Sequence, residues 1–122
     1  MSSQSSFLIL GTGALGTLFA ERLSAAGYAV TMLGTWPAAL EALRTRGARV
    51  RWPDGSVTAA RVRVASSPAD VPPARAAIVL VKSWQTPRAA RWLAECLAAD
   101  GVALTLQNGL GNDAVLAEAL GR

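Results

Sequence analysis

Three glycines near the N-terminus have the spacing with the clearest chemical meaning in this chain. They lie in the run Gly11-Thr12-Gly13-Ala14-Leu15-Gly16, directly after a short apolar segment and before a stretch with helical spacing. At these positions glycine permits a tight turn, a close approach of the backbone to a ligand, and close packing of the helix on the strand. The start of the helix adds unpaired N–H groups and a partial positive charge. The run therefore predicts a site for a diphosphate.

A diphosphate bound in this way is typical of the dinucleotides NADP(H) and NAD(H). The choice between them depends on an acidic residue about 20 positions further on, which would hold the adenosine ribose 2′-hydroxyl. The sequence there reads Leu33-Gly34-Thr35-Trp36, without an acid, which favours NADP(H) and leaves NAD(H) open. Thr35 and Arg44 are candidates for a 2′-phosphate, and an ordinary exposed helix residue is the alternative for Arg44. The candidate cofactor-binding residues so far are Gly11, Thr12, Gly13, Ala14, Leu15, Gly16 and Thr35.

Two further polar residues follow later apolar runs. Lys82, the only lysine, comes directly after the run 78–81, and Asn108 lies in Gln107-Asn108-Gly109-Leu110-Gly111-Asn112 after the next run. Ligands bind where the carboxyl ends of parallel strands meet. An ammonium there can hydrogen-bond a substrate carbonyl, and an amide can bridge a cofactor ribose and a substrate oxygen. We take Lys82 and Asn108 as candidate catalytic and cofactor-binding residues; a solvated loop lysine and an Asn-Gly turn are the alternatives. No metal ligand is predicted.

The elements that position these residues follow from the apolar pattern. Continuous apolar runs typical of buried parallel strands are Phe7–Leu10, Tyr28–Leu33, Ala76–Val81 and Val102–Leu106. Helical spacing predicts helices from Ala14 to Ala26, from Pro37 to Gly47, from Thr86 to about Ala99, and from Asn112 to Leu120. In the first helix the side chains expected to face the core are Leu15, Leu18, Phe19, Leu23 and Ala26, with Glu21, Arg22 and Ser24 on the other side. The pattern predicts an α/β fold with a mainly parallel, doubly wound sheet.

An antiparallel hairpin interrupts this alternation. Arg49–Trp52 and Ser56–Ala59 alternate in polarity and flank a Pro-Asp-Gly turn. Arg61–Val64 continues the alternation after a phase slip at Ala59-Ala60, which we interpret as a bulge. The proline-rich stretch 66–75 predicts a loop or a brief helical turn.

Size and composition indicate one domain over residues 1–122. The chain is 52% apolar and 16% charged, which argues against disorder. Its arginines are spread out, so nucleic acid is not an expected partner. No apolar run approaches the roughly 18 residues of a membrane span, and the first six residues lack the basic region of a secretory signal. A single cysteine, Cys96, forms no internal disulfide and is expected to be buried and inert. We expect a cytoplasmic protein.

Three motifs together resemble the ketopantoate reductases (2-dehydropantoate 2-reductases). They are the glycine run 11–16, Val81-Lys82-Ser83-Trp84-Gln85-Thr86, and the segment 107–112, in the family's order and spacing. The resemblance covers nearly the whole chain. It implies a Rossmann fold and NADPH-dependent reduction of 2-dehydropantoate to pantoate, a step of pantothenate and coenzyme A synthesis. By position it implies that the three glycines bind the pyrophosphate and that Lys82 and Asn108 line the nicotinamide and substrate site.

The chain departs from the family pattern in two respects. Family members commonly have an arginine for the 2′-phosphate where this chain has Thr35. The family also carries a helical C-terminal domain with a catalytic lysine and a substrate-binding glutamate, and this sequence ends at Arg122 before it. We therefore expect weak dinucleotide binding and little turnover from these residues alone, with a small 2-oxo acid as substrate and a second copy or the helical domain as partner. The alternatives are a stand-alone nucleotide-binding or redox-sensing module, and a related dehydrogenase for another 2-oxo acid.

Overall fold

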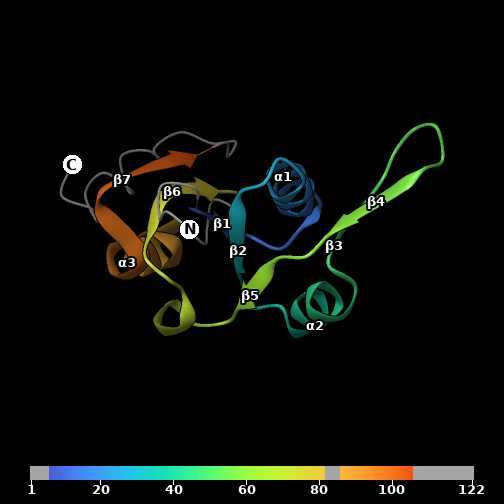
Figure 1. Cartoon of the computed structure of the whole chain (residues 1–122). Coiled ribbons are helices and arrows are strands. Elements are labelled where there is room, and N and C mark those ends of the chain that lie inside the picture. Colours follow the sequence, from blue (N-terminus) through green and yellow to red (C-terminus); the bar gives the residue numbers. More distant parts are fainter. Residues whose placement is uncertain (1–5, 82–85, 106–122) are drawn as a thin grey trace.

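The main sheet of the protein is parallel and has five strands, flanked by helices (Figure 1). The computed structural model describes residues 6–81 and 86–105. The sheet order is β5-β2-β1-β6-β7, with bounds β1 Ser6–Leu10, β2 Ala29–Leu33, β5 Arg63–Ala65, β6 Ala74–Val79 and β7 Leu97–Thr105. The helices are α1 Ala14–Ala25, α2 Pro37–Arg46, the short 3-10 helix η2 Pro68–Asp70, and α3 Thr86–Cys96. Strands β3 Ala48–Arg51 and β4 Val57–Ala60 form a separate antiparallel pair. The predicted fold class is confirmed.

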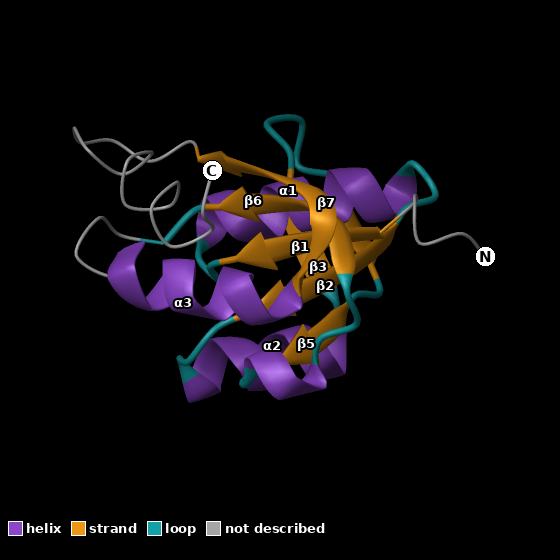
Figure 2. Cartoon of the chain, turned by 90° about the vertical axis from the view of Figure 1, so that its left-hand side faces the viewer, coloured by secondary structure: helices purple, strands orange, loops and turns teal. Residues whose placement is uncertain are grey.

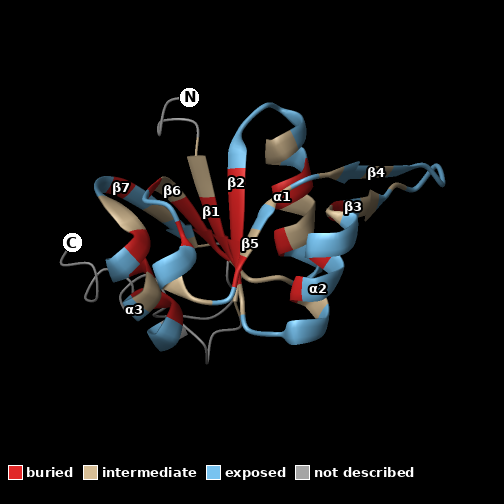
Figure 3. Ribbon diagram, turned by 60° about the horizontal axis from the view of Figure 1, so that its bottom comes forward, coloured by how far each residue is buried: buried red, intermediate tan, exposed pale blue. Residues whose placement is uncertain are grey.

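Helices cover both faces of the main sheet, and the side chains of β1 show which helix covers which face. Leu8 and Leu10 pack in one cluster with residues of α3, whereas Ile9 packs in a second cluster with residues of α1 and α2. Figure 2 shows α3 lying across one face, and Figure 3 shows buried residues concentrated on β1 and β2 between the helices. All three β1 side chains are at most 1% exposed. This two-sided burial explains why β1 is continuously apolar instead of alternating.

The carboxyl ends of three strands meet at one edge of the sheet. Leu10 pairs with Leu33 of β2 on one side and with Val79 of β6 on the other. The connections that follow β1, β2 and β6 therefore all begin at the same edge of the sheet. This is the edge at which the glycine run and the residues after β2 are placed together.

The structure confirms most expected elements and moves the boundary between the third helix and the last strand. α3 ends at Cys96 and β7 begins at Leu97, instead of a helix to Ala99 and a strand from Val102. The reason is strand pairing: Leu97 pairs with Ala74 and, after an irregularity, Val102 pairs with Ala76. Backbone bonding to β6 thus overrides the helical pattern of the side chains. The helix expected at 112–120 lies outside the described residues.

The expected inward face of α1 is wrong in part. Leu15 is 48% exposed and Ala26 is exposed, whereas Glu21 is 1% exposed. The cause is that α1 has two neighbours: Gly16 and Ala20 face the sheet, and the β3–β4 hairpin packs beside the helix where Glu21 lies. A pattern analysis that assumes one buried face cannot place a carboxylate under a hairpin.

The buried carboxylate of Glu21 belongs to a polar network between α1 and the hairpin. Arg22 Nε donates to Glu21 Oε2 at 2.7 Å, and Thr58 adds a second side-chain hydrogen bond. Trp52 Nε1 donates to Thr58 Oγ1 at 2.8 Å, and the Arg22 guanidinium lies 4.9 Å from the centre of the Trp52 ring. The Arg22 hydrogen bond holds the pKa of Glu21 below its ordinary value, against the opposing effect of burial. We call these four residues, Glu21, Arg22, Trp52 and Thr58, the hairpin clamp.

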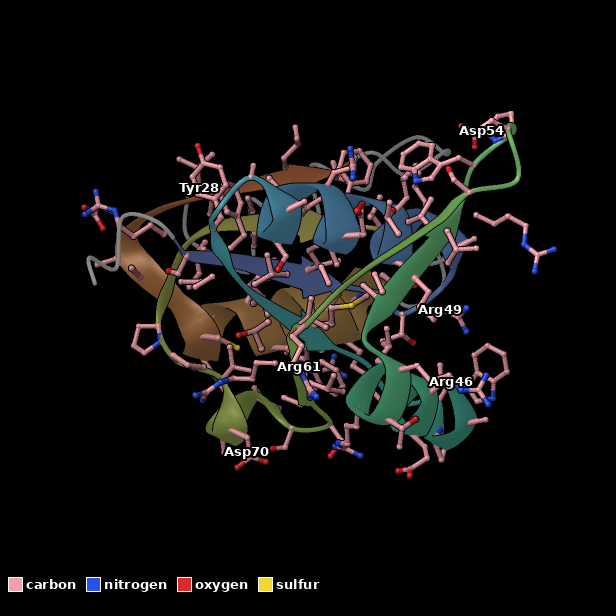
Figure 4. All side chains as sticks on the ribbon, turned by 45° about the vertical axis from the view of Figure 1, so that its right-hand side comes forward. Tyr28, Arg46, Arg49, Asp54, Arg61 and Asp70 are labelled. Carbon is pink, nitrogen blue, oxygen red and sulfur yellow. The ribbon has the colours of Figure 1, made fainter. Side chains whose placement is uncertain are left out.

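The rest of the hairpin extends away from the sheet. Figure 4 shows Asp54 at its tip. The tip is exposed, and its hydrogen bonds are local: Gly55 N donates to Trp52 O at 2.9 Å, and Ser56 N donates to Asp54 Oδ1 at 2.9 Å. The Pro-Asp-Gly turn predicted from the sequence is thus where the chain reverses.

The phase slip after β4 is not a bulge. β4 ends at Ala60, and the chain then crosses to the main sheet, where β5 pairs in parallel with β2 from Arg63. At the crossing Ser24 Oγ of α1 donates to Arg61 O at 3.0 Å. The change of phase therefore marks a switch from one sheet to the other. The brief helical turn expected in 66–75 is confirmed as η2.

The hairpin clamp predicts a pH-dependent contribution to stability. A lowered pKa in the folded state stabilises the fold above the ordinary glutamate pKa of about 4.3, and this stabilisation is lost as pH falls through the folded value. We expect Glu21→Gln to lower the free energy of unfolding at neutral pH by about 1 kcal/mol, because half-exposed Arg22 is partly screened. Urea unfolding at neutral pH and at a pH well below the glutamate range measures the difference. It should vanish in acid, and Glu41→Gln on the exposed side of α2 should show no such change. An equal loss at both pH values would contradict this account.

Candidate functional site

A cavity of about 340 Å³ opens at the carboxyl edge of the sheet. It lies between the turn after β1, the end of β2, the segment after β6 and the first turns of α3. Its floor is apolar, with a rim of backbone and polar groups, which is the usual composition of a small-molecule site. The lining residues are Leu10, Gly11, Thr12, Gly13, Leu33, Gly34, Thr35, Trp36, Leu80, Val81, Arg88, Ala89 and Trp92.

Gly11 is required by the geometry of the turn. Its φ of +122° is a conformation that side chains rarely adopt, and a Cβ there would lie 3.1 Å from the backbone carbon of Leu80. Gly11 N donates to Leu33 O at 3.1 Å, and Leu80 N donates to Leu10 O at 2.8 Å. These two bonds tie the turn to the neighbouring strand ends on both sides.

Gly16 and Gly13 differ in what requires glycine. A Cβ at Gly16 would lie 2.4 Å from Gly11 O, so the close packing of α1 on the turn excludes a side chain. Gly13 has φ −79° and ψ −167°, which any residue adopts, and a Cβ there would meet nothing within 4 Å. The described fold therefore needs glycine at 16 and does not need it at 13. The space that a side chain at 13 would fill lies on the cavity wall.

The structure brings four of the predicted cofactor-binding residues to the cavity: Gly11, Thr12, Gly13 and Thr35. Ala14, Leu15 and Gly16 are not among the residues that line it. They begin α1, where the first N–H groups have no helical acceptor, since the first bond within the helix runs from Thr17 N to Gly13 O. These residues therefore offer a ligand the free backbone N–H groups at the start of α1.

Of the other predicted site residues, the structure describes Arg44, which is not in the cavity lining. Arg44 is exposed in the last turn of α2, roughly 12 Å along the helix axis from the cavity-lining Trp36. This agrees with the alternative of an ordinary surface residue. Lys82 and Asn108 lie outside the described residues. Among those described, no group of three metal-ligating side chains is present.

Among the lining residues that sequence reasoning missed, three carry an aromatic or charged side chain: Trp36, Arg88 and Trp92. Trp36 is 64% exposed although it is a large aromatic residue. Arg88 and Trp92 are four positions apart on α3, which places them on one face of the helix. This i, i+4 spacing at the start of the helix that follows β6 was the available signal. It has meaning only once α3 is known to cover this part of the sheet.

The electrostatics of the cavity favour an anion. Gly13 is the N-cap of α1, Trp36 is the N-cap of α2, and Arg88 lies in the first turn of α3, so three helix N-termini border the cavity. None of the three helices has an acidic residue in its first turn. Among the described residues, Arg88 is the only charged one in the cavity lining. Helix N-termini carry partial positive charge, so these elements favour negative charge together.

Cys96 lies at the end of α3 behind the cavity wall. Its Sγ donates to Trp92 O at 2.9 Å, and burial raises the thiol pKa to about 11. A thiol with so high a pKa is protonated at neutral pH and is a poor nucleophile. The expectation of a buried cysteine is confirmed.

No helix in the described part of the chain has the length and apolar character to cross a membrane.

The parallel sheet, the glycine turn between β1 and α1, and the cavity at the carboxyl edge define a Rossmann-type α/β domain. The model of the family described as ketopantoate reductase PanE/ApbA matches residues 7–122. The chain therefore belongs to the ketopantoate reductase family, as the three sequence motifs predict.

Comparisons with known proteins agree with this assignment. A 2-dehydropantoate 2-reductase of Halobacterium salinarum is 45% identical over 112 residues, which are 91% of this chain and 36% of that protein. The crystal structure of a PanE/ApbA family ketopantoate reductase from Ralstonia eutropha JMP134 superposes with a TM-score of 0.83 at 29% identity, covering 93% of this chain and 37% of that one. A D-mandelate dehydrogenase structure, at 20% identity and a TM-score of 0.82, shares the fold. The chain spans about a third of the length of the curated relatives it matches.

The different roles of the two glycines can be separated by a matched pair of substitutions. Gly16→Ser is expected to lower the free energy of unfolding by about 1–3 kcal/mol, because its Cβ overlaps the Gly11 carbonyl. Gly13→Ser is expected to leave stability unchanged or raise it by a few tenths of a kcal/mol, since serine is a good N-cap in extended backbone. Urea unfolding of the two variants measures both effects. Similar losses from both would show that the fold needs glycine at 13.

Proposed function

We propose that this chain binds NADPH and forms the nucleotide half of the active site of a 2-dehydropantoate 2-reductase. The observation that supports this best is Gly13, at which the fold leaves open the space of a side chain beside the N-terminus of α1. A diphosphate placed there would accept hydrogen bonds from unpaired N–H groups. Family membership and the Halobacterium salinarum relative, named as a 2-dehydropantoate 2-reductase, support the choice of reaction.

Different residues of the cavity lining would bind different parts of a dinucleotide. The backbone of Gly11 to Gly13 would face the diphosphate, and Thr35 after β2 would face the adenosine ribose. The absence of an acid at the end of β2 favours NADPH over NADH, since a carboxylate there would repel a 2′-phosphate. Leu10 and Leu80 form an apolar floor that excludes water from the nucleotide. When bound, the cofactor supplies a hydride for reduction of a ketone.

Lys82 and Asn108 are proposed to line the nicotinamide and substrate site. Each follows the end of a strand by three positions, and the two strand ends, Val79 of β6 and Thr105 of β7, pair with each other. Their equivalent positions along adjacent parallel strands support a shared site. There an ammonium at Lys82 would hold the keto acid oxygen, and the Asn108 amide would orient substrate and ribose. The substrate is the 2-oxo acid 2-dehydropantoate, and the proton source is proposed to lie in the additional length of the relatives.

Nucleotide binding is tested by substitutions at Gly13 that preserve the helix cap. Asp and Asn are both good N-caps, so Gly13→Asp and Gly13→Asn are expected to fold as well as the unaltered chain. Both should weaken NADPH binding by filling the open space, and Gly13→Asp should weaken it more, by over tenfold, because its charge repels the diphosphate. Isothermal titration with NADPH measures the order. Unchanged affinity in Gly13→Asp would show that the diphosphate site is elsewhere.

The reaction is tested in a chimera. In the Halobacterium salinarum relative, the matched 112 residues are replaced by the corresponding part of this chain. The chimera is expected to oxidise NADPH when 2-dehydropantoate is added, and Lys82→Ala in it should lower kcat much more than it weakens NADPH binding. The loss of NADPH absorbance measures the rate. A chimera that binds NADPH but reduces only other 2-oxo acids would contradict the proposed substrate.

A further inference from the structure

Arg88 is a charged residue on the cavity wall with no structural role evident in the fold. Its side chain is exposed, and neither ion pair in the described part of the chain involves it. It also lies in the first turn of α3, where the partial positive charge of a helix disfavours a cation and where no acidic residue offsets it. An anion bound in the cavity would turn this unfavourable position into a favourable one.

The location of α3 shows which part of a nucleotide Arg88 would meet. Ala89, the next residue, belongs to the buried cluster that also contains Leu33 and Ala65, the last residues of β2 and β5. Leu33 and Ala65 pair with each other, and Gly34 N donates to Ala65 O at 3.2 Å. Figure 2 shows that α3 begins on the side of the sheet toward which the strand arrows point. Leu33, Gly34 and Thr35 line the same cavity as Arg88, so the first turn of α3 borders a cavity that it shares with the end of β2, where this fold places the adenosine ribose.

The glycine turn already provides for a diphosphate through backbone N–H groups, and it does so at the end of β1. The end of β2 offers Thr35, an uncharged hydroxyl, on the same cavity wall. A second, doubly charged phosphate at this end would find no cation among Gly34, Thr35 and Trp36, the residues that connect β2 to α2. A guanidinium fits a phosphate with two parallel hydrogen bonds, and Arg88 is the one residue carrying this group in the described part of the lining.

Resting on the proposed function, we propose that Arg88 binds the 2′-phosphate of NADPH and, with Thr35, determines the preference for NADPH over NADH. Specificity is then set by the first turn of α3 and only secondarily by the segment after β2. Trp92, one helical turn beyond Arg88, adds an aromatic surface to the same wall.

The test compares two arginines of α3. Arg88→Leu and Arg91→Leu each remove one positive charge from an exposed position of the same helix, but only Arg88 lines the cavity. NADPH and NADH are titrated into the unaltered 122-residue chain and both variants by calorimetry at one ionic strength. We expect Arg88→Leu to weaken NADPH binding by about tenfold to a hundredfold, the range for a charge-assisted hydrogen bond, and to change NADH binding by less than about twofold. Arg91→Leu should change neither, and Arg88→Lys should restore part of the NADPH affinity.

Other outcomes would overturn either the proposal for Arg88 or the proposed function on which it rests. Equal losses of NADPH and NADH in Arg88→Leu would overturn the proposal, because Arg88 would then serve the shared diphosphate. Unchanged NADPH affinity, or an equal loss in Arg91→Leu, would overturn it as well. If the unaltered chain bound neither nucleotide at millimolar concentration, the proposed function itself would fail, and the role of Arg88 with it.

Discussion

The close contact between the N-terminus of α1 and the turn after β1 is the constraint on which the rest of the structure depends. Gly16 packs so tightly on the Gly11 carbonyl that no side chain fits between them. This contact holds the first turn of α1 over the carboxyl edge of the sheet. It thereby fixes where unpaired N–H groups point, which backbone faces the cavity, and how far a ligand can approach at Gly13. Because neither Gly11 nor Gly16 carries a side chain, the backbone itself can form this part of the site.

The cavity shows how several weak electrostatic features combine. In the described part of the chain, three helix N-termini border it, none of them has an acid in its first turn, and one arginine, Arg88, supplies a full charge. Each helix contributes only a partial charge that falls off within a turn. Their convergence follows from the parallel topology, because the helices after β1, β2 and β6 all begin at the same edge of the sheet. An anionic ligand is thus favoured by the fold itself, and individual side chains determine which anion.

A feature of the fold or of the site could be predicted from the sequence when residues close together in the chain determine it. The strand β1, the glycine turn and the Pro-Asp-Gly reversal each follow from short-range requirements, and all are where the sequence predicts them. The burial of Glu21 was not predictable in this way, because it depends on a hairpin that begins more than 20 residues later. The position of Arg88 at the cavity was not predictable for the same reason, because it depends on the path of α3 over the sheet. Residues positioned by packing between distant elements leave no periodic signal of their own.

The hairpin has anchored strands and a free turn. The hairpin clamp fastens the hairpin to α1, the helix whose first turn borders the cavity, through Trp52 and Thr58, whereas the hydrogen bonds of Asp54 and Gly55 in the turn are to immediate neighbours. Changes in loop length at the tip would thus leave the nucleotide edge undisturbed. The same reversal is accordingly an attachment point for a fluorophore or an inserted peptide tag that reports on the protein without intruding on its ligand.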